Sequence, residues 1–273
     1  MCFALDIAPS GYYKWKKCKK TLREQADDRL LLKIREIHST KHARYGAPRI
    51  HAELKEAGEC CGRKRVARLM RLNGIVAKHK RKFKATTDSQ HKFAVAPNLL
   101  EQNFRVSEPN RIWTADITYC WTLEGWVYLA VVLDMYSRKI VGWAMSERMT
   151  RDLVIKAFLM ACKARNPSPG LIHHSDKGSQ YASDDFKKVL SIFGVRQSMS
   201  GKGNCYDNAV TETFFHTLKT ELMFGCLFET REEAISAVFE YIEVFYNRER
   251  RHSTLGYCSP VKFEQYLELR NVA

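Results

Sequence analysis

The sequence lacks the features of a secreted or membrane-anchored protein. It has no long apolar run, and its first residues have neither the basic start nor the apolar core of a signal peptide. Its nine cysteines include no Cys-x-x-Cys pair, and the adjacent Cys60 and Cys61 do not make a zinc site by themselves. We therefore expect a cytoplasmic protein with reduced thiols and no membrane partner.

Negative charge is scarce in the N-terminal part of the chain. Residues 1–100 contain 24 lysines and arginines against nine aspartates and glutamates, whereas residues 101–273 contain 21 of each. The whole net charge of +15 therefore belongs to the first hundred residues. This asymmetry predicts a polyanion-binding module joined to a neutral body, and an ordinary solvated basic surface is the alternative.

The basic part has the periodicity of three short helices. Apolar residues recur at helical spacing over residues 25–40 and 62–73. Pro48 lies near the start of another helix over 49–57, and Gly74 follows the last of the three. This order of elements indicates a helix-turn-helix domain, and a small helical bundle with a basic face is the alternative.

The third of these helices is the expected DNA-binding element. One face is apolar, and basic side chains cover much of the remainder: Arg63, Lys64, Arg65, Arg68 and Arg71. We expect these five side chains to contact DNA. The predicted domain spans residues 25–75, with a basic arm over 1–24 before it and a basic linker over 76–104 after it.

The rest of the chain changes from strand patterns to alternating helices and strands. Valine, isoleucine, tyrosine and tryptophan mark three strands joined by short turns, at residues 112–120, 126–133 and 139–145. Four further elements follow: a helix at 151–165, a strand at 171–174, a helix at 183–193 and a strand at 195–199. An antiparallel meander followed by such an alternation predicts a mixed α/β layered fold.

Three acidic residues lie in this body in unlike contexts. Asp116 interrupts an apolar strand pattern, where a charge needs exposure or a partner. Asp176 ends a short apolar strand, where turn chemistry is the structural alternative. Glu212 lies on a helix predicted over 208–219, and at 100° per residue it shares the polar face with Lys219. An ordinary solvated face is the alternative for that helix.

Such a set of carboxylates is what two-metal phosphoryl transfer requires. Hard divalent cations bind carboxylate oxygens, and two of them must be held a few ångströms apart. The sequence therefore indicates a Mg²⁺-dependent enzyme that cuts and joins DNA. Asp134 is a rival carboxylate with a ready explanation as a turn residue, and we interpret His173 and His174 as structural rather than metal-binding.

Several motifs together resemble the DDE integrase core of retroviral integrases and bacterial transposases. The core motifs are Trp113–Tyr119, His174–Tyr181 and Asp207–Glu212 with Lys219. Two flanking segments, Tyr45–Ile50 and Asn247–Pro260, resemble the second-frame transposases of the insertion-sequence-three type. The resemblance covers the chain from about Ser10 to about Glu264, with the motifs in the same order and at the same spacing.

The resemblance implies a fold and a site. The fold would be a ribonuclease-H-like integrase catalytic core over residues 105–225, a mixed five-stranded sheet with flanking helices, preceded by the small all-α helix-turn-helix domain. A C-terminal helical segment over 226–273 would follow. Asp116, Asp176 and Glu212 would be catalytic and would bind two Mg²⁺ ions, for which Mn²⁺ can substitute. Lys219 would lie near the terminal DNA phosphates.

The resemblance also implies partners. The substrates would be double-stranded DNA, namely the terminal inverted repeats of an insertion sequence and a target. Members usually act as multimers on paired ends, at the bacterial nucleoid. A first-frame protein normally supplies a further helix-turn-helix and a leucine zipper, often through a frameshifted fusion. This chain begins at Met1 and has no sustained heptad repeat, so we expect it to be the downstream product.

Two functions of other classes remain open. A DNA-binding regulator without catalysis would bind element ends equally well with and without Mg²⁺. A nuclease of the ribonuclease H type would cleave RNA–DNA hybrids without strand transfer. The basic N-terminal domain and the shared face of Glu212 and Lys219 argue against the nuclease.

Overall fold

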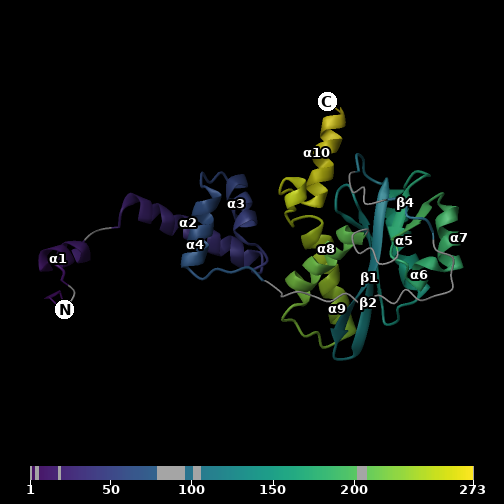
Figure 1. Ribbon diagram of the computed structural model, residues 1–273, viewed down its shortest axis with the longest axis horizontal. Helices are drawn as coiled ribbons and strands as arrows, with labels where there is room; N and C mark the ends of the chain where they lie inside the picture. Colours follow the sequence, from purple (N-terminus) through teal and green to yellow (C-terminus); the bar gives the residue numbers. More distant parts are fainter. Residues whose placement is uncertain are drawn as a thin grey trace. The chain divides into compact units, whose positions relative to one another are not determined.

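The computed structural model describes residues 2–3, 6–17, 20–78, 96–100, 106–201 and 208–272. The chain divides into two compact units, Met1–Lys78 and His79–Ala273, and each is described by itself (Figure 1). Most of the predicted basic linker, and the loop that precedes the Glu212 helix, lie outside the described residues.

The N-terminal unit is entirely helical in its described residues. Its elements are α1 (Pro9–Lys17), α2 (Leu22–Thr40), α3 (Ala47–Glu56) and α4 (Arg63–Leu72). The three predicted helices are confirmed as α2, α3 and α4, and α1 lies within the N-terminal segment predicted as a basic arm. Helix α2 begins earlier than predicted because Thr21 and Glu24 form a capping box. The Thr21 hydroxyl accepts from the Glu24 N–H at 3.2 Å, and the Glu24 carboxylate accepts from the Thr21 N–H at 2.7 Å.

A small apolar core joins α2, α3 and α4. Tyr45, in the turn before α3, is fully buried. The three helices also contribute buried side chains, namely Leu30, Ile34, Ile50, Leu54, Val66, Leu69 and Met70. Pro48 occupies the first turn of α3, where a missing N–H costs nothing. The core therefore fixes α4 against the other two helices and leaves its basic face outward.

The C-terminal unit is built on one mixed five-stranded sheet, as predicted. Its strands are β1 (Ile112–Thr122), β2 (Gly125–Asp134), β3 (Ile140–Ser146), β4 (Ile172–Ser175) and β5 (Arg196–Met199), in the spatial order β3-β2-β1-β4-β5. Strands β1 to β3 form the predicted antiparallel meander. Strand β4 pairs with β1 in the parallel sense, and β5 pairs with β4 in the same sense.

Helices cover both faces of this sheet (Figure 1). One face packs against α5 (Arg151–Arg165), α6 (Ser179–Ala182) and α7 (Asp184–Ile192) around a large apolar cluster. The other carries α8 (Ala209–Leu218), the π-helical turn η3 (Lys219–Met223), α9 (Arg231–Phe239) and the second π-helical segment η4 (Glu240–Tyr246). Helix α5 has its predicted bounds, whereas the short α6 was not predicted. In the described residues, no helix combines the length and apolar content that crossing a lipid bilayer would require.

Gly142 in β3 sets the distance between the sheet and α5. A Cβ atom at this position would lie 2.2 Å from the carbonyl oxygen of Ala157 and 2.7 Å from the backbone nitrogen of Ala161. Only glycine permits so close an approach of two backbones. The glycine therefore allows α5 to pack tightly over β3.

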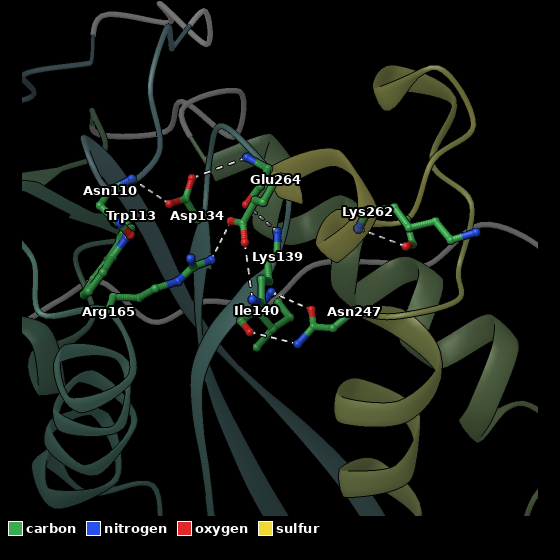
Figure 2. A network of polar contacts seen from close by, with 11 residues as sticks. Asn110, Trp113, Asp134, Lys139, Ile140, Arg165, Asn247, Lys262 and Glu264 are labelled. Atoms are coloured by element: carbon green, nitrogen blue, oxygen red, sulfur yellow. Dashed lines mark hydrogen bonds and ion pairs between the residues drawn. The ribbon is translucent and has the colours of Figure 1, made fainter. Parts of the chain in front are cut away.

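The C-terminal segment is attached to the same sheet by polar contacts. The side-chain amide of Asn247 donates to the carbonyl of Ile140 and accepts from its N–H, both at 3.0 Å, so it pairs with the edge strand as another strand would (Figure 2). Helix α10 (Pro260–Val272) brings Glu264 within 2.5 Å of Arg165 and 3.3 Å of Lys139. These contacts join the end of the chain to the sheet.

Candidate functional site

Strand β1 holds Asp116 on the face opposite the large apolar cluster. Side chains alternate along a strand, and Trp113 and Ala115 enter that cluster, so Thr114 and Asp116 point to the other face. Asp116 is half-buried, and its Oδ1 accepts a hydrogen bond from the N–H of Ile117 at 2.7 Å. The strand pattern thus positions one carboxylate in the middle of the sheet.

The parallel register between β1 and β4 brings Asp176 level with Asp116. Thr114 pairs with His174, and the same offset extended by two residues places Asp116 beside position 176, just past the end of β4. The Oδ1 of Asp176 accepts from the N–H of Gly178 at 3.0 Å, which is the turn interaction expected for this residue. Asp176 therefore stabilises the turn after β4 and also lies beside Asp116.

Helix α8 brings Glu212 to the same region. The buried hydroxyl of Thr211 donates to the buried hydroxyl of Thr114 at 2.8 Å, and the side-chain amide of Asn208 donates to the carbonyl of Ala115 at 3.4 Å. These two contacts hold the first turn of α8 on the strand that carries Asp116. Glu212 follows Thr211 directly and is exposed. Thr114, Thr211 and Asn208 were not predicted as site residues.

The charges of the other two carboxyl groups both act on Asp116. The pKa of Asp116 is raised well above its usual value, first by burial, then by the negative charge of Asp176, and further by that of Glu212. Partial burial raises the pKa of Glu212 as well. The charged form of Asp116 is therefore disfavoured next to these negative charges. A bound cation would relieve this repulsion.

Lys219 brings a positive charge into the same region. It begins the π-helical turn that follows α8, and its Nζ stands 5.0 Å from the centre of the Tyr119 ring. Its positive charge lowers the pKa of Asp116, as the Ile117 N–H does, against burial and the two neighbouring carboxylates. The charge of Lys219 therefore acts on Asp116, and its place near DNA phosphates stays a prediction.

The donor chemistry fits a hard divalent cation. Asp116, Asp176 and Glu212 offer carboxylate oxygens, and the repulsion among them favours a positive charge between them. Across the described residues, however, no three histidine, cysteine, aspartate or glutamate side chains converge closely enough to form a metal cage. The three residues would have to draw together around an ion.

The other carboxylate and histidine candidates have structural roles. Asp134 is fully buried and accepts from the N–H groups of Asn110 at 2.7 Å and Tyr136 at 2.8 Å, so it holds the turn after β2 (Figure 2). His173 is buried among aromatic rings, and burial lowers its pKa to about 3. The Nδ1 of His174 lies 2.8 Å from the Ser198 hydroxyl on β5.

The basic residues of α4 divide into two groups. Arg65 and Arg68 both form ion pairs with Asp27 of α2, and the Arg65 pair measures 2.6 Å. They therefore tie α4 to α2 within the N-terminal unit. The other three predicted DNA-binding residues are exposed: Arg63, Lys64 and Arg71. The helical periodicity could not separate these groups, because Asp27 lies far away in the sequence.

Comparison with known proteins gives matches along most of the chain. A family described as "Integrase core domain" matches residues 106–205, a second of the same description matches 212–267, and an "HTH-like domain" matches 25–83. The chain is 49% identical over 265 residues to "Insertion element IS600 uncharacterized 31 kDa protein" of Shigella sonnei, covering 97% of each. It is 44% identical over 266 residues to "Transposase InsF for insertion sequence IS3A" of Escherichia coli (strain K12), covering 97% of this chain and 92% of that one.

Among solved structures, one match is a simian T-cell lymphotropic virus intasome in complex with the PP2A regulatory subunit B56 gamma. Sequence identity is 17% and the TM-score is 0.49, with 84% of this chain and 73% of that chain covered.

Proposed function

The chain belongs to the insertion-sequence transposases with an integrase core, and from that premise we propose that Asp116, Asp176 and Glu212 form its catalytic site. The observation that carries the proposal is the pairing of β1 with β4. The register of these strands, together with the Thr211–Thr114 contact, gathers carboxylates from three distant segments at one place. The reaction is cleavage and strand transfer of DNA at the terminal inverted repeats of an insertion sequence.

Each residue has a distinct role in this proposal. Asp116, Asp176 and Glu212 hold Mg²⁺, two ions in the proposed reaction, and Mn²⁺ can substitute. When bound, the metal activates the attacking oxygen and stabilises charge on the phosphate. Asp116 would hold the ion from within the sheet, where a cation would offset the repulsion between its carboxylate and the charges of Asp176 and Glu212. Glu212 is exposed and closes the site from α8.

Lys219 orients the DNA in this site. Its ammonium lies near enough to Asp116 to affect that carboxylate, yet it stands over Tyr119 further along β1. A phosphate beside the scissile one would meet this charge. Lys219 therefore sets where along the strand the carboxylates act.

We propose that the N-terminal unit adds affinity for duplex DNA. The excess charge lies in the first hundred residues, and an HTH-like domain matches residues 25–83. The exposed side chains of Arg63, Lys64 and Arg71 bind DNA phosphates directly. Arg65 and Arg68 form ion pairs with Asp27 and so hold α4 in position. The chain works on paired ends as a multimer, with the first-frame protein separate or fused, at the bacterial nucleoid.

A cell-based assay tests the catalytic assignment. A donor plasmid carrying the two ends of the element is combined with the full chain and the first-frame protein, and joined or excised DNA is measured. Glu212→Gln is expected to abolish the product. Glu232→Gln is the matched control, because Glu232 is an exposed glutamate on α9 of the same unit, and it is expected to leave the product unchanged. Full activity of Glu212→Gln would overturn the assignment.

A further inference from the structure

A pocket lies beside the proposed catalytic site, at the end of the sheet away from β4. Its volume is about 270 Å³. We propose that it binds one unpaired nucleobase of the DNA end, with Lys219 on the adjoining phosphate. The inference rests on the proposed DNA substrate. The residues that line it include Tyr119, Trp121, Trp126, Lys219 and Phe228.

The topology of the sheet creates this hollow. Strand β4 pairs with β1 over Ile112–Thr114, so among the described residues the rest of that edge of β1 has no neighbouring strand. The loop after η3 reaches the far end of β1. There Thr122 bridges to Phe228, and the N–H of Leu123 donates to the Phe228 carbonyl at 3.0 Å. The loop thus meets this end of β1 and leaves a recess between that end and Lys219.

An aromatic cluster forms one wall of the recess. The Trp121 and Trp126 rings are 4.8 Å apart at 70°, and Tyr119 stands 5.0 Å from Trp126 at 88°. The exposed fraction of the residue is 49% for Trp121, 44% for Trp126 and 37% for Tyr119. Three partly exposed rings in contact leave π-faces open to solvent, and nucleobases stack on such faces whatever their sequence. The cluster is therefore suited to a flat aromatic group.

The single charged residue of the lining favours a planar ligand that carries a negative charge next to it. Of the described residues that line the pocket, Lys219 alone is charged, and its Nζ lies over Tyr119 at the wall. A ligand with a planar apolar part and an adjacent negative charge matches this arrangement, and a nucleotide within a DNA strand has both. The volume suits one such base better than a larger ligand.

The position of Lys219 connects the pocket to the proposed reaction. The same ammonium that borders the pocket acts electrostatically on Asp116. A strand whose scissile phosphate lies at the carboxylates would therefore place a neighbouring nucleotide at the pocket. A base can enter only when it is unpaired, so the pocket would hold a frayed or single-stranded nucleotide at the element end.

A binding comparison with the full chain tests the pocket. Two probes are used, a blunt duplex of the element end and the same duplex with a short unpaired flank, and fluorescence anisotropy gives the ratio of the two affinities. The ratio removes the contribution of the N-terminal unit, which both probes share. The native chain is expected to prefer the flanked duplex. Trp126→Ala is expected to reduce that preference about tenfold, the worth of one stacked base.

Matched variants separate stacking from other causes. Trp126→Phe keeps an aromatic face and is expected to keep most of the preference, whereas Trp121→Leu keeps an apolar side chain and is expected to lose it. Phe239→Ala removes an aromatic side chain of similar exposure on α9, outside the pocket, and is expected to change nothing. Equal preference in native chain, Trp126→Ala and Trp121→Leu would overturn the proposal, as would loss of preference in Phe239→Ala.

The Glu212→Gln chain distinguishes this proposal from the catalytic one. It is expected to keep the preference for the flanked duplex while it loses cleavage. Cleavage by Glu212→Gln together with the expected tryptophan effects would sink the catalytic assignment and leave the pocket standing. Loss of cleavage in Glu212→Gln, with no effect of either tryptophan variant on the preference, would support the catalytic assignment and overturn the pocket proposal.

Discussion

The buried hydroxyl of Thr211 donates a hydrogen bond to the buried hydroxyl of Thr114 at 2.8 Å. Thr114 lies two residues before Asp116 on β1, and Thr211 lies one residue before Glu212 on α8. This hydrogen bond between neutral side chains therefore helps to hold the helix that carries Glu212 on the strand that carries Asp116.

Thr211→Val is expected to reduce both stability and activity. It leaves the Thr114 hydroxyl buried without its partner, which costs about 1–3 kcal/mol. Urea unfolding measures this loss. Thr114→Val combined with Thr211→Val is expected to recover much of the stability, since both polar groups are gone. Equal losses from the single and double variants would show that the hydrogen bond contributes nothing specific.

Asp116→Asn is expected to stabilise the metal-free protein at neutral pH. The folded pKa of Asp116 is raised, so its neutral form is favoured in the native state, and stability falls as pH rises from about 4 towards that raised value. Asparagine cannot ionise, so the variant does not lose stability as pH rises through this range. Thermal melts of both proteins in a chelator are expected to diverge as pH rises and to converge near pH 4. Added Mg²⁺ is expected to raise the melting temperature of the native chain more than that of the variant.

An unchanged pH profile in Asp116→Asn would contradict the electrostatic account of this site. Asp152→Asn on α5 is the control, because that carboxyl group is exposed and lies in the same unit. It is expected to follow the native pH profile and to respond to Mg²⁺ as the native chain does.

Arg250→Met is expected to destabilise the C-terminal unit by about 3–5 kcal/mol. Arg250 and Glu221 are 5% and 6% exposed and pair at 2.8 Å, and the Tyr241 hydroxyl donates to the same carboxylate at 2.8 Å. Removing the arginine leaves a buried carboxylate without its charge partner. Arg151→Met breaks an exposed pair with Asp185 and is expected to cost less than about 1 kcal/mol in the same urea measurement. Similar losses of stability for the two variants would contradict the greater cost expected for breaking the buried pair.

Lys64→Ala and Arg71→Ala are expected to weaken binding to any duplex DNA. Each removes an exposed positive charge, so the slope of log affinity against log salt should fall by about 0.9 for each phosphate that is no longer neutralised. Arg65→Ala also removes an ion pair with Asp27, and it is expected to lower the melting temperature of the N-terminal unit as well. A salt series by fluorescence anisotropy, with melts of each variant, checks both. Unchanged slopes for Lys64→Ala and Arg71→Ala would exclude them as phosphate-binding residues.

Much of the fold was predictable because its signals are local. The turn between β1 and β2, the alternation within the meander and the bounds of α5 all follow from neighbouring residues. Helix α6 was missed because it is a single short turn between Gly178 and Ser183, too brief for helical periodicity to appear. The start of α2 was misplaced because the Thr21–Glu24 capping box was overlooked.

The site was predictable as a set of residues but not as an arrangement. Asp116, Asp176 and Glu212 were identified from their contexts and from family motifs, and their catalytic role stays a prediction. The hydrogen bonds that position them, such as that of Thr211 to Thr114, carry no local signal, because a threonine on a strand or helix is unremarkable by itself. The pairing of Arg65 and Arg68 with Asp27 was hidden for the same reason.

The sequence by itself determined most of the elements, the charge asymmetry and the choice of three candidate carboxylates, because periodicity and residue chemistry act over a few neighbouring positions. Only the tertiary structure decided which distant residues meet. The parallel register of β1 with β4 brought Asp176 beside Asp116, and the unpaired edge of β1 left the pocket next to Lys219 in the described part of the chain. Register and packing depend on burial across segments far apart in the chain, and no local pattern carries that information.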